Sequence, residues 1–309
     1  MTGGNKALME KINGRYKRNL GFRRVNVSKV IRVLISIIIL LVLFIAGSFI
    51  GNLLFNKSVE NEIETLFSKV KNKREIVNKA DIKALPRNVQ RWLEYSGIVG
   101  REKIVAVRLK QKADMRLEND KQWMSVQAEQ YFNTEEPGFI WKADIRAAPL
   151  IHIAGRDKYW DGKGSMLIKL LSLFTVADSE GKEINQGTLL RYLAEMVWFP
   201  TAVLNEYITW DEIDGDHAKA TMTYKDVTAS GVFTFNDKGE VIKFEAERYG
   251  EFDKKFRLEL WSISLRDYKE FEGIRIPIKG DVTWKLETGD FNWFNFEVTE
   301  IQYNKPLPY

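Results

Sequence analysis

The 309-residue sequence contains no cysteine and only two histidines, and both scarcities limit its chemistry. Without cysteine there are no disulfides, no thiol nucleophile, no thiolate metal ligand and no cysteine for lipid attachment. His152 and His217 are far apart, and neither HExxH nor a comparable ligand spacing occurs. No metal site and no cofactor are therefore predicted.

Catalytic signatures are also missing. The sequence has no G-x-S-x-G elbow and no G-x-G-x-x-G loop, and Ser165 beside a predicted hairpin is better interpreted as a turn residue than as a nucleophile. The catalytic residues, if there are any, are unknown from the sequence.

Charge is absent from one long stretch. Residues 33–56 carry no charged side chain, and most of them are Ile, Leu, Val or Phe. At about 1.5 Å per helical residue, these 24 positions span roughly 36 Å, more than the bilayer's hydrocarbon core of about 30 Å. The stretch predicts a transmembrane helix. A cleaved signal peptide is the alternative, but its apolar segment is usually only about 7–15 residues long.

The preceding residues predict the orientation of this helix. Positions 1–32 contain nine Lys and Arg residues and one acid, Glu10. By the positive-inside rule, this basic tail stays in the cytoplasm and residues 57–309 lie across the membrane. The sequence therefore predicts a single-pass protein of the cytoplasmic (inner) membrane with an extracytoplasmic C-terminal domain, and membrane lipid is a predicted partner.

The basic tail also accounts for the net charge of +5, because residues 33–309 carry 38 basic and 41 acidic side chains. A domain with a net charge of −3 is not a polyanion binder by bulk charge, so no nucleic-acid partner is predicted. The tail itself suits the anionic lipid headgroups of the cytoplasmic leaflet.

Two helices are predicted between the membrane and a β-rich domain. Apolar residues recur at helical spacing in the segment 57–80, which is typical of an amphipathic stalk helix. Its apolar stripe has three candidate partners: the domain, a second copy, or the headgroup layer. Pro86 and Gly97 delimit a second helix. The β-rich domain is taken as residues 81–309.

From Lys103 onward, apolar and polar residues alternate as in half-buried strands, with turn sequences between the runs. About ten or eleven strands without alternating helices exclude a doubly wound α/β fold. The predicted fold class is mainly β (α+β), a curved antiparallel sheet or half barrel plugged by apolar helices. The predicted strands lie near 105–109, 123–131, 139–145, 151–160, 208–213, 218–224, 227–235, 241–249, 256–268, 274–286 and 291–303.

One predicted helix is apolar nearly all round and must be buried, with Asn185 as its N-cap and Pro200 as its end. Arg191 and Glu195, its charged residues, are four apart on one face and can pair. The stretch 166–176 is also apolar, and its periodicity distinguishes neither strand nor helix. These segments either complete the core or line a cavity for an apolar ligand. The candidate cavity residues are Trp141, Trp160, Met166, Leu190, Leu193, Trp198 and Phe199.

Charge pairs recur beside aromatic residues, as in Arg156-Asp157 before Tyr159. Because adjacent strand residues face opposite ways, each pair places at most one member inside. Structural ion pairs explain the pattern better than catalysis does, although a glycosidase-like carboxylate pair remains an alternative. The candidates for a buried polar network are Glu129, Arg156, Asp157, Arg191, Glu195, Glu245, Glu247 and Arg266.

Five blocks of the sequence are 85–100, 128–132, 155–166, 190–200 and 231–235. In these blocks the chain resembles an uncharacterised family of bacterial proteins, a domain of unknown function, over about residues 85–305. The resemblance implies no activity and no catalytic residues. At the level of the fold, the pattern is similar to the periplasmic lipoprotein carriers, whose curved antiparallel half barrel is plugged by helices over an acyl-chain cavity.

These features predict a membrane-anchored extracytoplasmic domain that binds a lipid or another hydrophobic ligand without catalysis. One alternative is an envelope hydrolase that uses buried carboxylates. Another is a scaffold or sensor with an envelope protein as its partner. The missing cysteine, serine elbow and clustered histidines favour binding over catalysis.

Overall fold

The structure is a computed structural model that describes residues 27–71, 74–253 and 255–309. Most of the predicted basic tail, residues 1–26, lies outside the described residues. The chain divides into two compact units, Met1–Gly47 and Ser48–Tyr309.

Helix α2 (Val27–Phe67) contains the predicted apolar stretch, and its side chains in the first unit, such as Leu40 and Leu43, are exposed. Within the described part of the chain, α2 is the one helix long and apolar enough to cross a membrane, by length and composition only. It ends at Phe67, well before residue 80. The Asn133 side-chain amide donates to the Leu66 carbonyl (3.0 Å) and satisfies one of the free carbonyls at this end.

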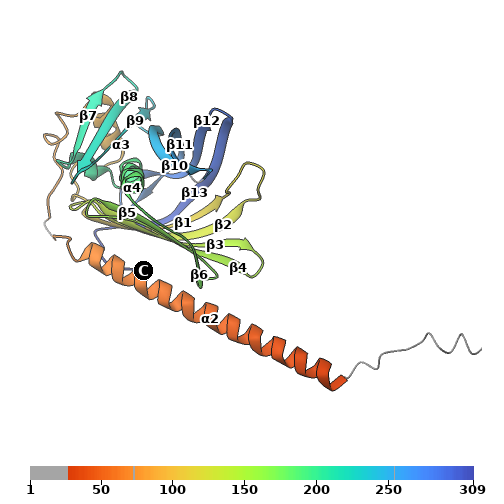
Figure 1. Cartoon of the computed structure of the whole chain (residues 1–309). Helices are drawn as coiled ribbons and strands as arrows, with labels where there is room; N and C mark the ends of the chain where they lie inside the picture. Colours follow the sequence, from red (N-terminus) through yellow and green to blue (C-terminus); the bar gives the residue numbers. More distant parts are fainter. Residues whose placement is uncertain (1–26, 72–73, 254) are drawn as a thin grey trace, which may run out of the picture. The chain divides into compact units, whose positions relative to one another are not determined.

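In the second unit, the described strands form one antiparallel sheet of thirteen strands in the order β6-β5-β4-β3-β2-β1-β13-β12-β11-β10-β9-β8-β7 (Figure 1). The predicted fold class is confirmed, with more strands than expected. The bounds are β1 Ala106–Met115, β2 Met124–Asn133, β3 Gly138–Ala148, β4 Ile151–Trp160, β5 Lys163–Leu170, β6 Phe174–Glu180, β7 Ile208–Glu212, β8 His217–Tyr224, β9 Val227–Phe235, β10 Val241–Phe252, β11 Lys255–Phe271, β12 Ile274–Leu286 and β13 Gly289–Tyr303.

The stretch 166–176, whose structure periodicity left open, belongs to strands β5 and β6 and the turn between them. Leu171 and Ser172 in this turn both have positive φ, 52° and 57°. The stretch lacks clean alternation because β5 contacts apolar partners on both faces. Leu167 packs against the core under α2, whereas α4 covers the other face of β5.

Helix α4 (Lys182–Glu195) lies across the inner, concave face of the sheet and continues into two 3-10 turns, η1 (Met196–Trp198) and η2 (Pro200–Leu204). The helix begins at Lys182, so the prediction of Asn185 as its N-cap is wrong. The Asn185 side chain instead accepts a hydrogen bond from the Gly164 backbone N–H (2.7 Å). A short helix, α3 (Arg87–Tyr95), adds Trp92 to the same core.

The C-terminal half of α2 covers the opposite, outer face of the sheet. Phe55, Val59 and Ile63 are buried against Tyr131 and Ile140. Three partners were predicted for the apolar stripe of the stalk helix. In the structure, the stripe packs on the β-rich domain. Parts of strands β1–β4 are covered on both faces, by α4 and its 3-10 turns inside and by α2 outside.

Candidate functional site

A polar cluster occupies the inner face beneath α4. The Arg191 guanidinium donates from Nη1 to Asp157 Oδ2 (2.6 Å) and from Nε to Glu195 Oε1 (2.8 Å), which is the predicted i,i+4 pair. Gln130 Nε2 donates to the other Glu195 oxygen (2.7 Å). The guanidinium also lies over the Phe139 and Trp141 rings, about 5 Å from each centroid. Both carboxylates therefore have protein donors.

Burial dominates the electrostatics of this cluster. It raises the pKa of Glu195 against the opposing effects of Arg191 and Gln130. Burial by itself lowers the pKa of Arg191, but Glu195 and Asp157 together raise it. A second arginine, Arg248, has its pKa lowered to about 10 by burial and by repulsion from Arg191. Arg248 thus adds a second positive charge beside the cluster.

An apolar band lies on the same inner face towards the end where β1 finishes and β2, β11 and β13 begin. Its members are only half-buried, whereas inner-face residues below the 3-10 turns, such as Phe132, have no exposed surface. The strand register places residues from both arms of the half barrel in this band. They are Met115, Met124, Ile153, Phe252, Leu286 and Phe291.

Arg248 lies between the polar cluster and the apolar band. Its guanidinium is over the Trp261 ring (4.5 Å to the centroid), and its Nε donates to the Gly187 carbonyl (3.2 Å). In the described ranges, no carboxylate oxygen lies within ion-pair distance of it. The Trp284 ring meets Phe252 edge-on at 5.4 Å, so aromatic surface continues from Arg248 into the band.

The predicted cavity residues fall into three places. Leu190, Leu193, Trp198 and Phe199 are packed into the core, with at most 2% of their surface exposed. Trp141 lies below Arg191 and donates to Gln111 (3.1 Å), and Met166 is half-buried on the inner face of β5. Trp160 is on the outer face, beside α2. Sequence periodicity did not single out the apolar band, whose members looked like ordinary strand residues.

Of the predicted polar network, the structure brings Asp157, Arg191 and Glu195 together and places the remaining members on the outer face. Arg156 pairs with Glu62 of α2 (3.1 Å). The others are Glu129 with Lys142, Glu245 with Lys243 and Ser262, Glu247 exposed on β10, and Arg266 with Asp281. Gln130 also joins the inner cluster, and no sequence pattern pointed to it.

The outer face carries two grooves, one on each side of α2. One of about 360 Å³ is polar and is lined by Asn52 and Asn56 of α2 together with Lys110, Lys142 and Glu129 of the sheet, among others. The other, of about 300 Å³, is lined by Glu62, Lys158 and Trp160, among others. Among the described residues, no group of three His, Asp or Glu side chains is placed to hold a metal ion.

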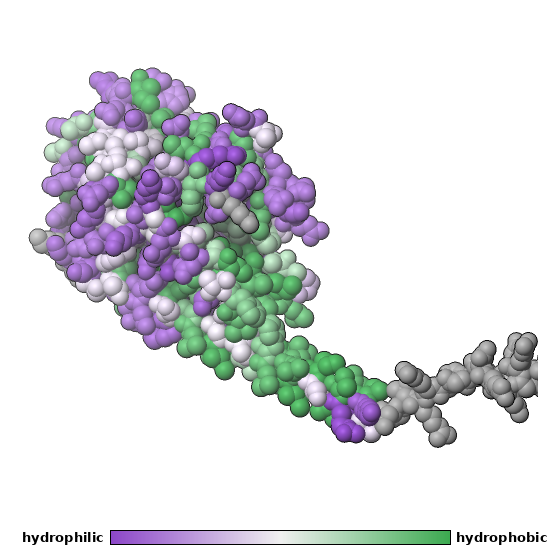
Figure 2. Space-filling model, viewed as in Figure 1, coloured by the Kyte–Doolittle hydropathy of each residue, from purple (hydrophilic) through white to green (hydrophobic). Residues whose placement is uncertain are grey.

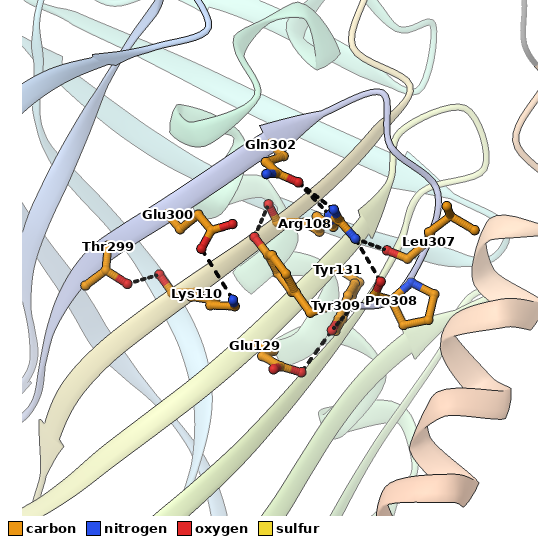
Figure 3. A network of polar contacts seen from close by, with 10 residues as sticks. All are labelled: Arg108, Lys110, Glu129, Tyr131, Thr299, Glu300, Gln302, Leu307, Pro308 and Tyr309. Carbon is orange, nitrogen blue, oxygen red and sulfur yellow. Dashed lines mark hydrogen bonds and ion pairs between the residues drawn. The ribbon is translucent and has the colours of Figure 1, made fainter.

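The C-terminus closes a further polar network on the outer face (Figure 3). The Tyr309 ring lies 4.5 Å from the Arg108 guanidinium and 4.0 Å from Lys110 Nζ, measured to the ring centroid. Its hydroxyl donates to the Arg108 carbonyl (3.2 Å), and its backbone N–H donates to the Tyr131 hydroxyl (3.3 Å). These contacts bind the last residue to β1 and β2, so this network is structural.

The fold and the inner face define an open antiparallel half barrel that a helix only partly fills. A family described as "Family of unknown function (DUF6544)" matches residues 75–296, and the chain belongs to this family. This confirms the resemblance predicted for residues 85–305 and extends it towards the N-terminus. A search of curated proteins finds no match.

Solved structures of similar fold include a LolA superfamily protein from Nitrosomonas europaea, with 12% identity, 71% of this chain and 94% of that chain covered, and a TM-score of 0.41. A DUF1329 family protein from Desulfovibrio piger has 11% identity, coverages of 74% and 94%, and a TM-score of 0.42.

Proposed function

We propose that the chain is a single-pass membrane protein whose half barrel binds a lipid or another hydrophobic molecule on the open end of its inner face. The observation that carries the proposal is the apolar band. Large apolar side chains that remain half-exposed on a concave surface favour an apolar ligand, because covering them removes apolar area from water.

The polar cluster supports binding rather than hydrolysis. Asp157 and Glu195 are both held by Arg191, and the second Glu195 oxygen is held by Gln130. Glu195, with both oxygens already occupied, is poorly placed to act as an acid or base on a substrate. We assign the cluster the role of fixing α4 over β2 and β4, which leaves the apolar band uncovered.

The localisation is part of the proposal. The nine basic residues before the apolar stretch favour a cytoplasmic N-terminus, an anchor in the cytoplasmic (inner) membrane and an extracytoplasmic domain. A reporter that is active only outside the cytoplasm should work when fused after Tyr309. Activity of a cytoplasm-only reporter at that position would refute this topology.

Photo-crosslinking tests the ligand site. The full chain would carry p-benzoylphenylalanine at Phe291 of β13, on the inner face, or at Phe256 of β11, on the outer face, as a matched control. After purification in detergent and removal of bulk lipid, irradiation should attach a hydrophobic molecule at position 291 and not at 256, as detected by mass spectrometry. Absence of an adduct at 291, or equal adducts at both positions, would contradict the inner-face site.

A further inference from the structure

Two hairpin tips lie beside each other and beside the first residues of α2 that belong to the second unit. The β3–β4 tip is residues 148–151 and the β5–β6 tip is residues 170–174. The Leu171 N–H donates to the His152 carbonyl (2.9 Å), which joins the tips. Ser48 Oγ of α2 donates to the Leu171 carbonyl (2.8 Å), and Ser172 Oγ donates to Asn52 Oδ1 (3.4 Å). Both tips therefore lie beside residues 48–52 of α2.

These tips and the first residues of β6 next to them expose large apolar side chains. Leu150 is 98% exposed, Phe174 54% and Val176 58%, and Ile151 is exposed as well. Leu150 and Leu171 have φ of 67° and 52°, in the left-handed region, where Gly or Asn carries less strain than Leu. The exposed Leu150 side chain buries no apolar area in the folded domain, so it does not offset the strain of its turn. Figure 2 shows hydrophobic residues gathered on the side of the domain where α2 leaves it.

The depth of the tips follows from α2 if α2 spans the membrane, as proposed above. Crossing about 30 Å of hydrocarbon takes about 20 helical residues. Counted from Val33, the first uncharged position, that length ends near Asn52. The polar groove lined by Asn52, Asn56 and Lys142 begins at the same level, which is consistent with the hydrocarbon ending there. Residues 48–52 and the tips bound to them therefore lie at the bilayer surface.

We propose that the two tips dip into the bilayer and bury Leu150, Ile151, Phe174 and Val176 at the boundary between headgroups and acyl chains. The bilayer is then a partner of the folded domain and not of α2 alone. The register of the antiparallel strands places the tips at the same end of the sheet as Met115 and Phe291. The open end of the half barrel thus faces the membrane, and a lipid can reach the apolar band directly from the bilayer.

The natural absence of cysteine allows a direct test. Full-length Leu150→Cys and Phe174→Cys variants would be spin-labelled and reconstituted in phosphatidylcholine–phosphatidylglycerol vesicles. Electron paramagnetic resonance would then compare collisions with oxygen, which partitions into lipid, and with a water-soluble nickel chelate. Asp237→Cys, in the exposed β9–β10 turn, is the aqueous control, and Leu43→Cys in α2 reports on the anchor.

Labels at positions 150 and 174 should favour oxygen, as the label at 43 does, and the label at 237 should favour nickel. Tip labels that behave like the label at 237, while the label at 43 stays in lipid, would refute tip insertion and leave the anchor intact. Tip labels shielded from both reagents would indicate a protein partner or second copy and would also refute it. A label at 43 that favours nickel would refute the anchor as well.

Discussion

Strand β4 carries two charge networks, one on each face, and they begin at adjacent residues. Asp157 faces inward and binds Arg191 of α4, whereas Arg156 faces outward and binds Glu62 of α2. The inner arginine holds two carboxylates, whose side chains are 24% and 10% exposed. On the outer face the pattern is reversed, since Glu62 holds two cations, Arg156 and Lys158, and borders an open groove.

The difference shows that the same interaction has different energetic consequences under the two helices. If Glu195 beneath α4 loses its cation, this 10% exposed carboxylate stays in a largely apolar surrounding. If Glu62 under α2 is lost, Lys158 can turn towards the groove and be solvated, and Arg156 keeps its hydrogen bonds to Ser165. The inner network therefore locks α4 in place, whereas the outer network only reinforces an apolar contact between α2 and the sheet.

The largest expected effect is at Arg191. In an Arg191→Ala variant, Asp157 and Glu195 lose their shared cation beneath α4, so we expect the free energy of unfolding to fall by about 3–5 kcal/mol. Thermal unfolding of the full-length protein in detergent, followed by far-UV circular dichroism, measures this. The control is the combined variant Asp157→Leu, Arg191→Met, Glu195→Leu, which leaves no unpaired charge. A single variant as stable as this combined variant would contradict the buried-network interpretation.

A second comparison uses two glycines, Gly164 in β5 beneath α4 and Gly51 in α2 itself. A Cβ at Gly164 would lie 2.6 Å from the Ile184 carbonyl oxygen of α4 and 2.2 Å from Thr188 Oγ1, so Gly164→Ala should cost about 1–3 kcal/mol by pushing α4 off the sheet. A Cβ at Gly51 would lie 2.7 Å from the Ser172 carbonyl oxygen at a hairpin tip. There the gain in helix propensity, about 1 kcal/mol, offsets part of the clash, so Gly51→Ala should cost less than Gly164→Ala. Equal melting temperatures for the two variants would contradict the idea that α4 is packed more tightly on the sheet than α2 is.

A smaller effect is expected at Glu62. Glu62→Ala removes the partner of Arg156 and Lys158. Lys158 lines the groove and can be solvated there, and the buried Arg156 keeps its hydrogen bonds to Ser165, so the loss should be about 1–2 kcal/mol. Denaturant unfolding of wild type and variant under identical detergent conditions measures it. A loss as large as that of Arg191→Ala would mean that the outer network is as enclosed as the inner one.

The smallest effect is a pH dependence at Glu195. Its folded-state pKa is raised above the ordinary value of 4.5, so the folded protein binds this proton more tightly than the unfolded chain does. The contribution of Glu195 to stability is therefore fully present below that value and is lost as the pH rises through the folded-state pKa. Stability relative to Glu195→Gln should fall as the pH rises above the ordinary value of 4.5. A difference that rises with pH would contradict the raised pKa.

The sequence predicted the half barrel and the Arg191–Glu195 pair because both depend on local spacing, a period of two in strands and four residues on a helix. It could not predict which member of Arg156-Asp157 faces inward. Alternation gives the period of a strand but not its phase, and polarity sets the phase only when one face is wet. Both faces of β4 are covered by helices, so the sequence does not indicate which face of the sheet Asp157 and Trp160 occupy.

The apolar band was missed for a related reason. Its residues are the ends of ordinary alternating strands, and only the length and placement of α4 determine which inner-face residues remain uncovered. Helix α4 packs on β4, β5, β9 and β10, and this choice depends on Gly164 and the Asp157–Arg191 contact, which are long-range features. A single sequence does not encode them in any periodic pattern.

The order of the strands has a consequence for how the chain folds. Strands β1–β6 and β7–β13 are two runs of successive hairpins, and the two runs meet only where β1 pairs with β13, with Val107 opposite Tyr303. During synthesis, the edge of β1 that pairs with β13 remains unpaired until β13 has been made. Such a non-local pairing forms slowly and leaves an edge open to wrong partners in the meantime. Joining β1 to β13 is therefore the expected late step of folding.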